Sequence, residues 1–199
     1  MALAVLIHGY GSSAAEIRRE LDDLGGLDGL DLIAWDAPDR CDLFPDKRQW
    51  FQLSALDAFL SRAVAAAAEA LAERIGRIER GDGPIYLLGH SQGGMIAAFL
   101  ALSGRLPGSR AICVSASLPF LGAIPVDPAA DVTFVHGDDD QFVPVERLVG
   151  QIGSSWPLVR LPRVGHKFEG ELARAARDAL AERRRRDLEP GQPGGSGPS

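Results

Sequence analysis

The sequence predicts a three-layer α/β sandwich, in which helices cover both faces of a mostly parallel sheet. Short and nearly continuous apolar runs alternate along the chain with helical segments, and such runs are typical of strands buried on both faces of a parallel sheet. The length of 199 residues fits a single domain. Hydrophobic residues make up 46% of the chain and charged residues 24%, which indicates a globular rather than a disordered protein.

We expect a sheet of about six strands, because six runs have this apolar character. Each is separated from the next by enough chain for the right-handed crossover that parallel strands require. The predicted strands are Leu3–His8, Leu30–Asp36, Ile85–Gly89, Ala111–Ser115, Val132–His136 and Leu158–Leu161.

Five helices are predicted between and after these strands. The first, Ser12–Leu24, begins with two serines that suit an N-cap and ends before Gly25 and Gly26, which favour a helix stop. The others are Ala55–Ile75, which is rich in alanine, Gly93–Leu102, Pro144–Ile152 and Glu169–Arg186.

The C-terminal end differs in composition from the rest. Residues 1–188 are predicted to form one domain and residues 189–199 a disordered tail, because Pro190–Ser199 contains only Gly, Pro, Ser and Gln. The basic run Arg183–Arg186 could be a binding patch. A solvated helix end, where cations complement the helix dipole, is the favoured interpretation.

The charge balance limits the classes of partner. A net charge of −6 argues against a nucleic-acid-binding surface, and no apolar run approaches the roughly 18 residues of a membrane span. The first residues lack the basic region and cleavage site of a secretory signal. Cys41 and Cys113 are therefore expected to be reduced thiols of a cytoplasmic protein. The histidines and cysteines lack metal-ligand spacing, so we expect no metal. No cofactor is expected either, because the catalytic groups assigned below need none.

The strongest motif is Gly89-His90-Ser91-Gln92-Gly93, a G-x-S-x-G sequence that follows a predicted strand and opens a predicted helix. This strand–turn–helix context is the one in which the motif presents a nucleophilic serine on a sharp turn. Ser91 would lie at a helix N-terminus, where the dipole favours developing negative charge. A simple structural turn is the alternative, and the context disfavours it.

A nucleophilic serine needs a base and an acid that orients the base. His166 follows the last predicted strand and has carboxylates between itself and Ser91, so we assign it as the base. The acid is expected in the loop after Val132–His136. That loop holds Asp138, Asp139 and Asp140, and spacing alone does not separate them.

Two backbone N–H groups are expected to form an oxyanion hole. One belongs to Gln92, the residue after the nucleophile. The second is expected in the glycine-rich segment after the first strand, where Gly9 and Gly11 flank Tyr10. By itself this segment would be a glycine turn before a helix.

Together these motifs resemble the phospholipase/carboxylesterase family of α/β-hydrolases, which includes acyl-protein thioesterases. The resemblance extends roughly over 3–180. The matching segments are His8–Gly11, Ala37-Pro38, Arg48–Phe51, Gly89–Gly94, Ser115–Pro119, His136–Pro144 and Gly165-His166. Family members often begin with an additional hairpin, which is missing here, so six strands rather than eight are expected.

The resemblance also implies roles for particular residues. It selects Asp140 as the acid, from its place in the H-G-x-x-D-x-x-V-P pattern. It places the backbones of Tyr10 and Gln92 in the oxyanion hole, and Trp50 and Phe51 near an acyl pocket. The alternative for the two aromatic residues is a hydrophobic anchor for the helix that follows them.

We therefore expect a serine hydrolase that cleaves a small-molecule ester or thioester through an acyl-enzyme. The segment between the strands ending at Ser115 and beginning at Val132 is short and contains three prolines, so no cap domain and a preference for short acyl groups are predicted. The alternative function is a non-catalytic ligand- or partner-binding protein on the same scaffold. The oligomeric state and the physiological substrate are not determined by the sequence.

Overall fold

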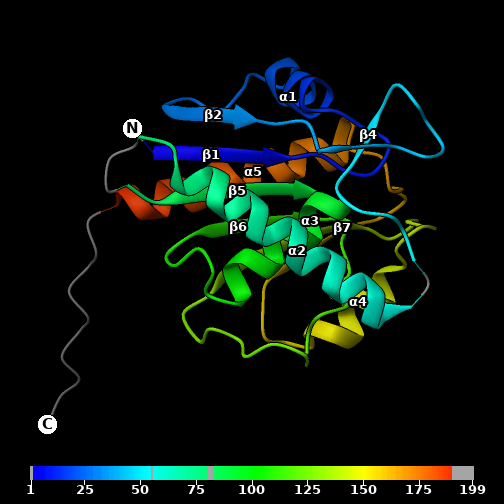
Figure 1. Ribbon diagram of the computed structural model, residues 1–199. Helices are drawn as coiled ribbons and strands as arrows, with labels where there is room; N and C mark the ends of the chain where they lie inside the picture. Colours follow the sequence, from blue (N-terminus) through cyan, green and yellow to red (C-terminus); the bar gives the residue numbers. More distant parts are fainter. Residues whose placement is uncertain (1, 55, 80–82, 190–199) are drawn as a thin grey trace, which may run out of the picture.

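A six-stranded parallel sheet forms the centre of the molecule (Figure 1). The computed structural model describes residues 2–54, 56–79 and 83–189. The strand order is β2-β1-β5-β6-β7-β8, and all five neighbouring pairs are parallel. The strands are β1 (Ala2–Ile7), β2 (Leu30–Ala34), β5 (Ile85–His90), β6 (Arg110–Val114), β7 (Asp131–Gly137) and β8 (Leu158–Leu161).

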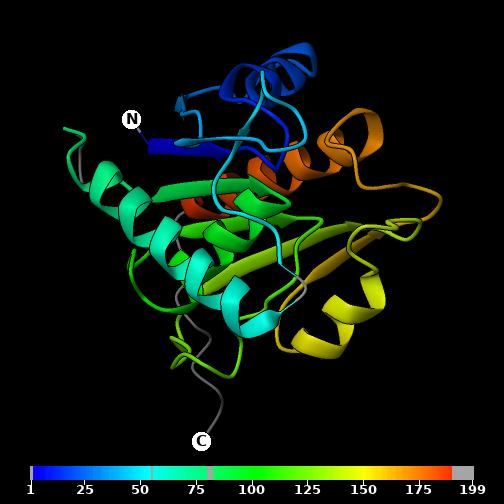
Figure 2. The ribbon, with the colours of Figure 1, turned by 45° about the vertical axis from the view of Figure 1, so that its right-hand side comes forward.

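Helices cover both faces of this sheet, as Figures 1 and 2 show from two sides. Helices α1 and α5 pack on one face, and α2 and α3 pack on the other. The helices are α1 (Ala14–Asp23), α2 (Asp57–Gly76), α3 (Gln92–Leu102), α4 (Val145–Ile152) and α5 (Gly170–Leu188). The predicted three-layer sandwich of six strands is therefore confirmed. The segment between β6 and β7 contains no helix, so no cap covers the sheet there.

Most predicted element boundaries differ from the observed ones by one or two residues. The predicted start of the second helix, Ala55, lies outside the described residues, and the observed helix begins at Asp57. The prediction missed a two-stranded antiparallel ribbon formed by β3 (Asp39–Arg40) and β4 (Arg48–Gln49). Strands of two residues are too short to show an alternating pattern in sequence.

Each face of the sheet has its own hydrophobic core. The larger core lies between the sheet and helices α2 and α3, and the smaller lies beneath α1 and α5. All eleven residues of α3 are buried. A helix that is apolar on every side is expected where a helix lies inside the protein rather than on its surface. This burial fixes the position of the N-terminus of α3, where Ser91 is located.

The basic run at the end of α5 is used within the molecule. The Arg183 side chain pairs with Asp131 and with Asp187, while Arg185 and Arg186 both pair with Glu182. These pairs support the helix-end interpretation. Residues 190–199 of the predicted tail lie outside the described residues.

No helix in the described part of the chain is long and apolar enough to cross a membrane. Cys41 and Cys113 are both buried free thiols. The cytoplasmic location stays a prediction.

Candidate active site

Ser91 lies on a strained turn between β5 and α3. Its φ of 52° is unusual for a residue that carries a side chain. The turn is tight enough that a Cβ on Gly89 would overlap the backbone of Gly93, and a Cβ on Gly93 would overlap the Ile7 carbonyl. The two flanking glycines of the motif are therefore required by close backbone approach, and the turn places the Ser91 side chain at the carboxyl edge of the sheet.

The side chains of Ser91, His166 and Asp140 form a continuous hydrogen-bonded chain. His166 Nε2 lies 3.1 Å from Ser91 Oγ, and His166 Nδ1 lies 2.7 Å from Asp140 Oδ2. Since a carboxylate only accepts, Nδ1 carries the proton in neutral His166 and Nε2 presents a lone pair to the serine. The three residues follow β5, β7 and β8, whose carboxyl ends meet at one edge of the sheet.

Asp140 is the one member of the aspartate run that is buried. Burial opposes ionisation, but hydrogen bonds from His136, from His166 and from the Val143 N–H outweigh it and hold the pKa of Asp140 well below its usual range. Its Oδ1 accepts the N–H groups of Phe142 and Val143 at 3.0 and 2.8 Å. Asp140 is therefore a carboxylate anion fixed in one orientation.

Two backbone N–H groups next to Ser91 are unused. Among the residues the structure describes, no acceptor takes the N–H of Tyr10 or of Gln92. Gln92 is the first residue of α3, where a helix leaves its N–H groups without an internal partner. The Tyr10 side chain turns away from the sheet and donates to Asp42 at 2.5 Å, which ties its loop to the β3–β4 ribbon.

The segment Trp50–Phe51 is hydrogen-bonded both to the start of α3 and to the residue that follows β1. The amide of Gln92 accepts from the Trp50 N–H at 2.9 Å and donates to the Phe51 carbonyl at 2.6 Å. The Trp50 indole donates to the His8 carbonyl at 2.9 Å. Both aromatic side chains belong to the larger core, with exposed fractions of 9% and 6%.

Three histidines that the sequence analysis did not assign support the site. His8 donates from Nδ1 to the Gly9 carbonyl and accepts the Ala37 N–H on Nε2. His90 Nε2 lies 2.7 Å from the His166 carbonyl, and His136 Nε2 lies 2.7 Å from the Val143 carbonyl. Each is next to a motif residue in the sequence, and this position was the one sequence signal of a supporting role. Sequence spacing does not show which way a ring points.

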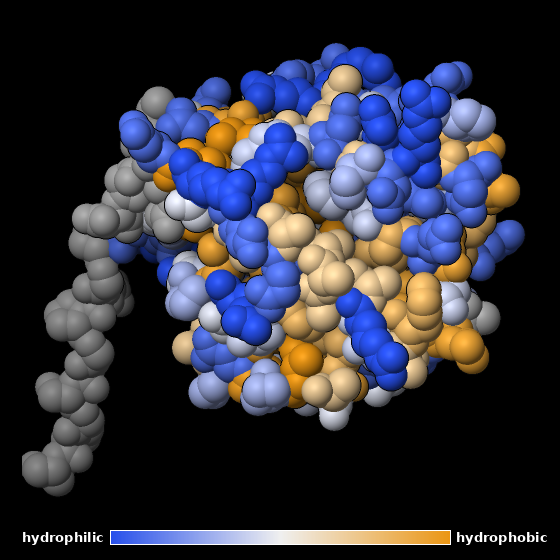
Figure 3. Space-filling view, viewed as in Figure 1, coloured by the Kyte–Doolittle hydropathy of each residue, from blue (hydrophilic) through white to orange (hydrophobic). Residues whose placement is uncertain are grey.

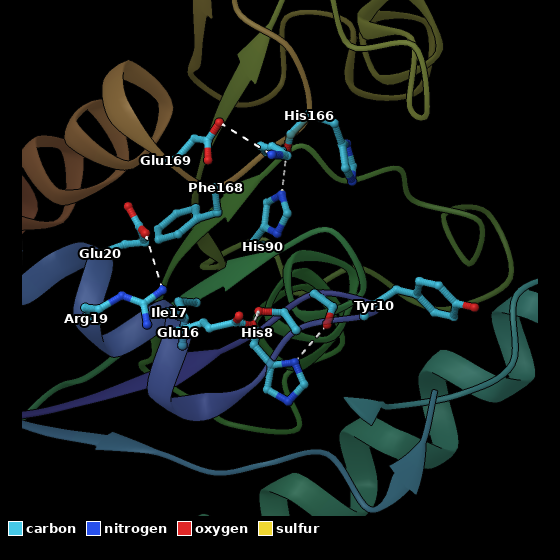
Figure 4. A pocket seen from close by; sticks show the side chains of 14 residues that line it. His8, Tyr10, Glu16, Ile17, Arg19, Glu20, His90, His166, Phe168 and Glu169 are labelled. Carbon is cyan, nitrogen blue, oxygen red and sulfur yellow. Dashed lines mark hydrogen bonds and ion pairs between the residues drawn. The ribbon is translucent and has the colours of Figure 1, made fainter. Parts of the chain in front are cut away.

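A cleft of about 300 Å³ opens beside His166, between α1 and the loop 165–169 (Figure 4). The end of β1 and the start of α1 form one wall, and His90, His166 and Phe168 form the other. Neither Trp50 nor Phe51 lines it. Trp50 instead lines a separate groove of about 200 Å³ against α2.

Large apolar side chains are exposed on segments near the carboxyl edge of the sheet. They come from the β3–β4 ribbon, the segment leading into α2, the first turn of α2 and the loop that carries Asp140. In Figure 3 hydrophobic residues appear at the right-hand margin, which is this edge. The exposed residues are Leu43, Phe44, Leu53, Leu56, Phe59 and Phe142.

The parallel sheet flanked by helices and the strained serine turn are the features of an α/β-hydrolase fold. Solved structures with this architecture are similar over almost the whole chain. Esterase PE8 is 24% identical, with a TM-score of 0.73 over 94% of this chain and 93% of that one. Acyl-protein thioesterase 2 of Zea mays is 21% identical, with a TM-score of 0.69 over 91% and 93%. The L63A variant of SOBER1 from Arabidopsis thaliana is 17% identical, with a TM-score of 0.67 over 94% and 99%. At these identities the likeness establishes the fold.

The family is established by sequence. The model of the phospholipase/carboxylesterase family matches residues 1–150, and the chain belongs to that family. It is accordingly a hydrolase of the esterase or thioesterase type. No curated protein matches the sequence significantly.

Proposed function

We propose that this hydrolase cleaves carboxylic esters or thioesters through an acyl-enzyme formed on Ser91. The observation that carries the proposal is the hydrogen-bonded chain from Ser91 Oγ through His166 to Asp140, at 3.1 and 2.7 Å. A serine, its base and an orienting carboxylate in this order are the parts that nucleophilic acyl transfer needs. In this proposal residues 1–188 form one catalytic domain.

In the first half of the reaction Ser91 Oγ attacks the substrate carbonyl carbon while His166 Nε2 takes the hydroxyl proton. The carbonyl oxygen becomes an oxyanion, and the N–H groups of Tyr10 and Gln92 donate to it. Asp140 holds His166 in the required tautomer and stabilises the imidazolium. His166 then returns the proton to the leaving alcohol or thiol as its bond to the acyl carbon breaks.

In the second half water replaces the alcohol. His166 removes a proton from the water as its oxygen attacks the acyl carbon, and the proton passes to Ser91 Oγ when the acyl-serine bond breaks. The residues named here bring all the required groups, so the proposal includes no metal or cofactor.

The proposed substrates carry small or short acyl groups. In the described part of the chain no cap covers the carboxyl edge of the sheet, and each added methylene contributes about 0.8 kcal/mol only while it is being buried. The exposed apolar side chains near the edge, Phe142 among them, offer contacts to a few carbons. A contact between the acyl group and the ring of Trp50 or Phe51 stays a prediction, since both rings are buried in the core.

The test combines active-site labelling with a substrate series. A fluorophosphonate probe should label the wild-type protein and fail to label Ser91→Ala, and Ser91→Ala should lose turnover while keeping its melting temperature. Ser103→Ala is the matched control, since Ser103 lies at the other end of the same helix and bonds only the Phe99 carbonyl. With p-nitrophenyl esters from acetate to palmitate, kcat/KM should stop rising after a few carbons.

Two outcomes would contradict the proposal. Normal turnover by Ser91→Ala would exclude Ser91 as the nucleophile. Absence of labelling and of turnover in the wild type would favour a binding protein on a hydrolase scaffold. A rate that rises beyond octanoate, or jumps when micelles form, would instead reject the short-chain preference alone.

A further inference from the structure

The cleft beside His166 carries charged side chains on both walls, together with the apolar side chains of Ile17 and Phe168. Figure 4 shows Glu16, Arg19 and Glu20 of α1 on one wall and Glu169 on the other, with His90 between His166 and the end of β1. An alkyl chain entering this cleft would desolvate charged groups without replacing their hydrogen bonds, which is unfavourable. These charged groups therefore favour a substrate part that brings hydrogen-bonding groups into the cleft.

The charges around the cleft are paired. Glu16 pairs with Lys47, Glu20 lies 3.9 Å from Arg19, and Glu169 lies 3.9 Å from Lys167. Each carboxylate thus has a cation next to it, although Lys47, the partner of Glu16, does not itself line the cleft. Specific recognition of an ion needs an opposite charge that is available to it, so these walls favour a neutral ligand that forms hydrogen bonds.

His90 presents an unused hydrogen-bond acceptor to this cleft. A carbonyl oxygen only accepts, so the 2.7 Å contact with the His166 carbonyl requires the proton on His90 Nε2. Burial, together with the nearby His166, lowers the pKa of His90 to about 3, so the ring is neutral at ordinary pH and Nδ1 carries a lone pair. No donor among the described residues reaches Nδ1.

The environment of His90 fixes the direction of that lone pair. The side chain is 91% buried, and its ring packs against those of His166 and Phe168 at centroid distances of 5.0 and 5.5 Å. His8, on the facing wall, uses both of its ring nitrogens within the protein. The free nitrogen of His90 is therefore available to an O–H or N–H donor that enters the cleft.

We propose that the cleft binds the leaving group of the substrate, and that this group is a neutral polyol whose hydroxyl donates to His90 Nδ1. The proposal rests on the proposed esterase function. The leaving side is assigned because His166, which returns the proton to the leaving oxygen, forms part of the cleft wall. Glycerol and a monosaccharide share the required chemistry.

The main experiment compares butyrate esters that differ only in the alcohol. We expect kcat/KM for glyceryl monobutyrate or for a glucose monobutyrate to exceed that for propyl butyrate, by about three- to tenfold if one neutral hydrogen bond decides the difference. Which polyol ester is faster distinguishes glycerol from a sugar. In His90→Phe this ratio should fall to about one, because phenylalanine keeps a packed ring and lacks the acceptor.

A matched control separates recognition from general damage. His90→Phe also loses the bond to the His166 carbonyl, so propyl butyrate turnover should fall as well, and the ratio between the two esters isolates the contribution of Nδ1. Lys167→Gln changes a charge at the cleft without touching His90, and it should keep the wild-type ratio. Loss of the ratio in Lys167→Gln, with its retention in His90→Phe, would show that Lys167 and not His90 recognises the alcohol and would overturn the proposal.

Acyl transfer gives a second measurement that needs no variant. With p-nitrophenyl butyrate as the acyl donor, glycerol competes with water for the acyl-enzyme. A glycerol hydroxyl oxygen bonds the acyl carbon as the acyl-serine bond breaks, and the hydroxyl proton passes to His166 and then to Ser91 Oγ. Glycerol should form several-fold more ester than 1-propanol at equal concentration. Equal yields, or a wild-type ester ratio of one or less, would overturn the polyol site. Absence of turnover with every butyrate would instead reject the esterase function.

Discussion

Burial and hydrogen bonding distinguish the three consecutive aspartates that follow β7. Asp138 pairs with Arg160 at 2.7 Å at the surface, and Asp139 is exposed. Asp140 is 4% exposed and uses both oxygens, one for His166 and the other for two backbone N–H groups. One residue type at three adjacent positions thus has three environments, and the geometry around Asp140 suits the acid of a triad.

The first prediction separates these positions by substitution. Asp140→Asn should lower kcat by up to about 10⁴-fold, because an amide favours the wrong tautomer of the histidine beside it. Asp139→Asn should be nearly neutral, and Asp138→Asn should cost stability at most, since it loses only the Arg160 pair. Steady-state kinetics and thermal unfolding of the three variants provide the comparison. Greater sensitivity at Asp138 or Asp139 would show that Asp140 is not the acid.

The segment Trp50–Phe51 connects two elements of the candidate site, a role that the burial of its side chains does not reveal. Through the Gln92 amide it is bound to the start of α3, and through the Trp50 indole it is bound to the end of β1. These are the two places from which the proposed oxyanion N–H groups come. The segment therefore holds the two donors at a fixed separation.

The second prediction tests that coupling with Gln92→Met. Methionine has a similar length but leaves the Trp50 N–H and the Phe51 carbonyl buried without partners, at a cost of about 1–3 kcal/mol each. We expect a lower melting temperature together with a reduced kcat and a nearly unchanged KM, because the oxyanion forms only during the reaction.

Gln151→Met is the matched control for this variant. Gln151 makes the same two bonds to the backbone of Leu118, at 2.8 and 3.1 Å, and it is not part of the proposed oxyanion hole. It should lose stability in a similar way with a smaller effect on kcat. Equal losses of kcat in both variants would show that the effect of Gln92 is one of stability alone.

At the scale of the whole molecule, the buried histidines couple the site to the stability of the fold. Burial lowers the pKa values of His8 and His90, the latter to about 3, whereas unfolded histidine titrates near 6.5. Below pH 6.5 the unfolded chain therefore binds more protons than the native one, and stability falls as pH falls. Asp140 acts in the same direction, but its contribution is lost only below about pH 4, as the unfolded carboxyl becomes protonated.

The third prediction concerns this acid sensitivity. Between pH 6.5 and 5 the contribution of His90 to the free energy of unfolding should fall by about 1.5–2 kcal/mol. Urea unfolding of His90→Phe should accordingly show a shallower pH dependence than the wild type over this range. Phe120→Leu, which loosens the larger core and leaves His90 and its ring neighbours in place, should show the wild-type slope. Identical slopes for wild type and His90→Phe would mean that His90 is not held neutral in the native protein.

The sequence alone determined the fold class, the six strands, the serine turn and the family, because these depend on local patterns. Apolar runs specify buried strands, and the glycines around Ser91 permit a turn that other residues would obstruct. Only the tertiary structure decided what depends on long-range approach and side-chain direction. Asp140 and His166 are 26 residues apart along the chain, and Gln92 and Trp50 are 42 apart. The β3–β4 ribbon, the burial of Trp50 and the free nitrogen of His90 likewise follow from packing between distant segments, which no local pattern records.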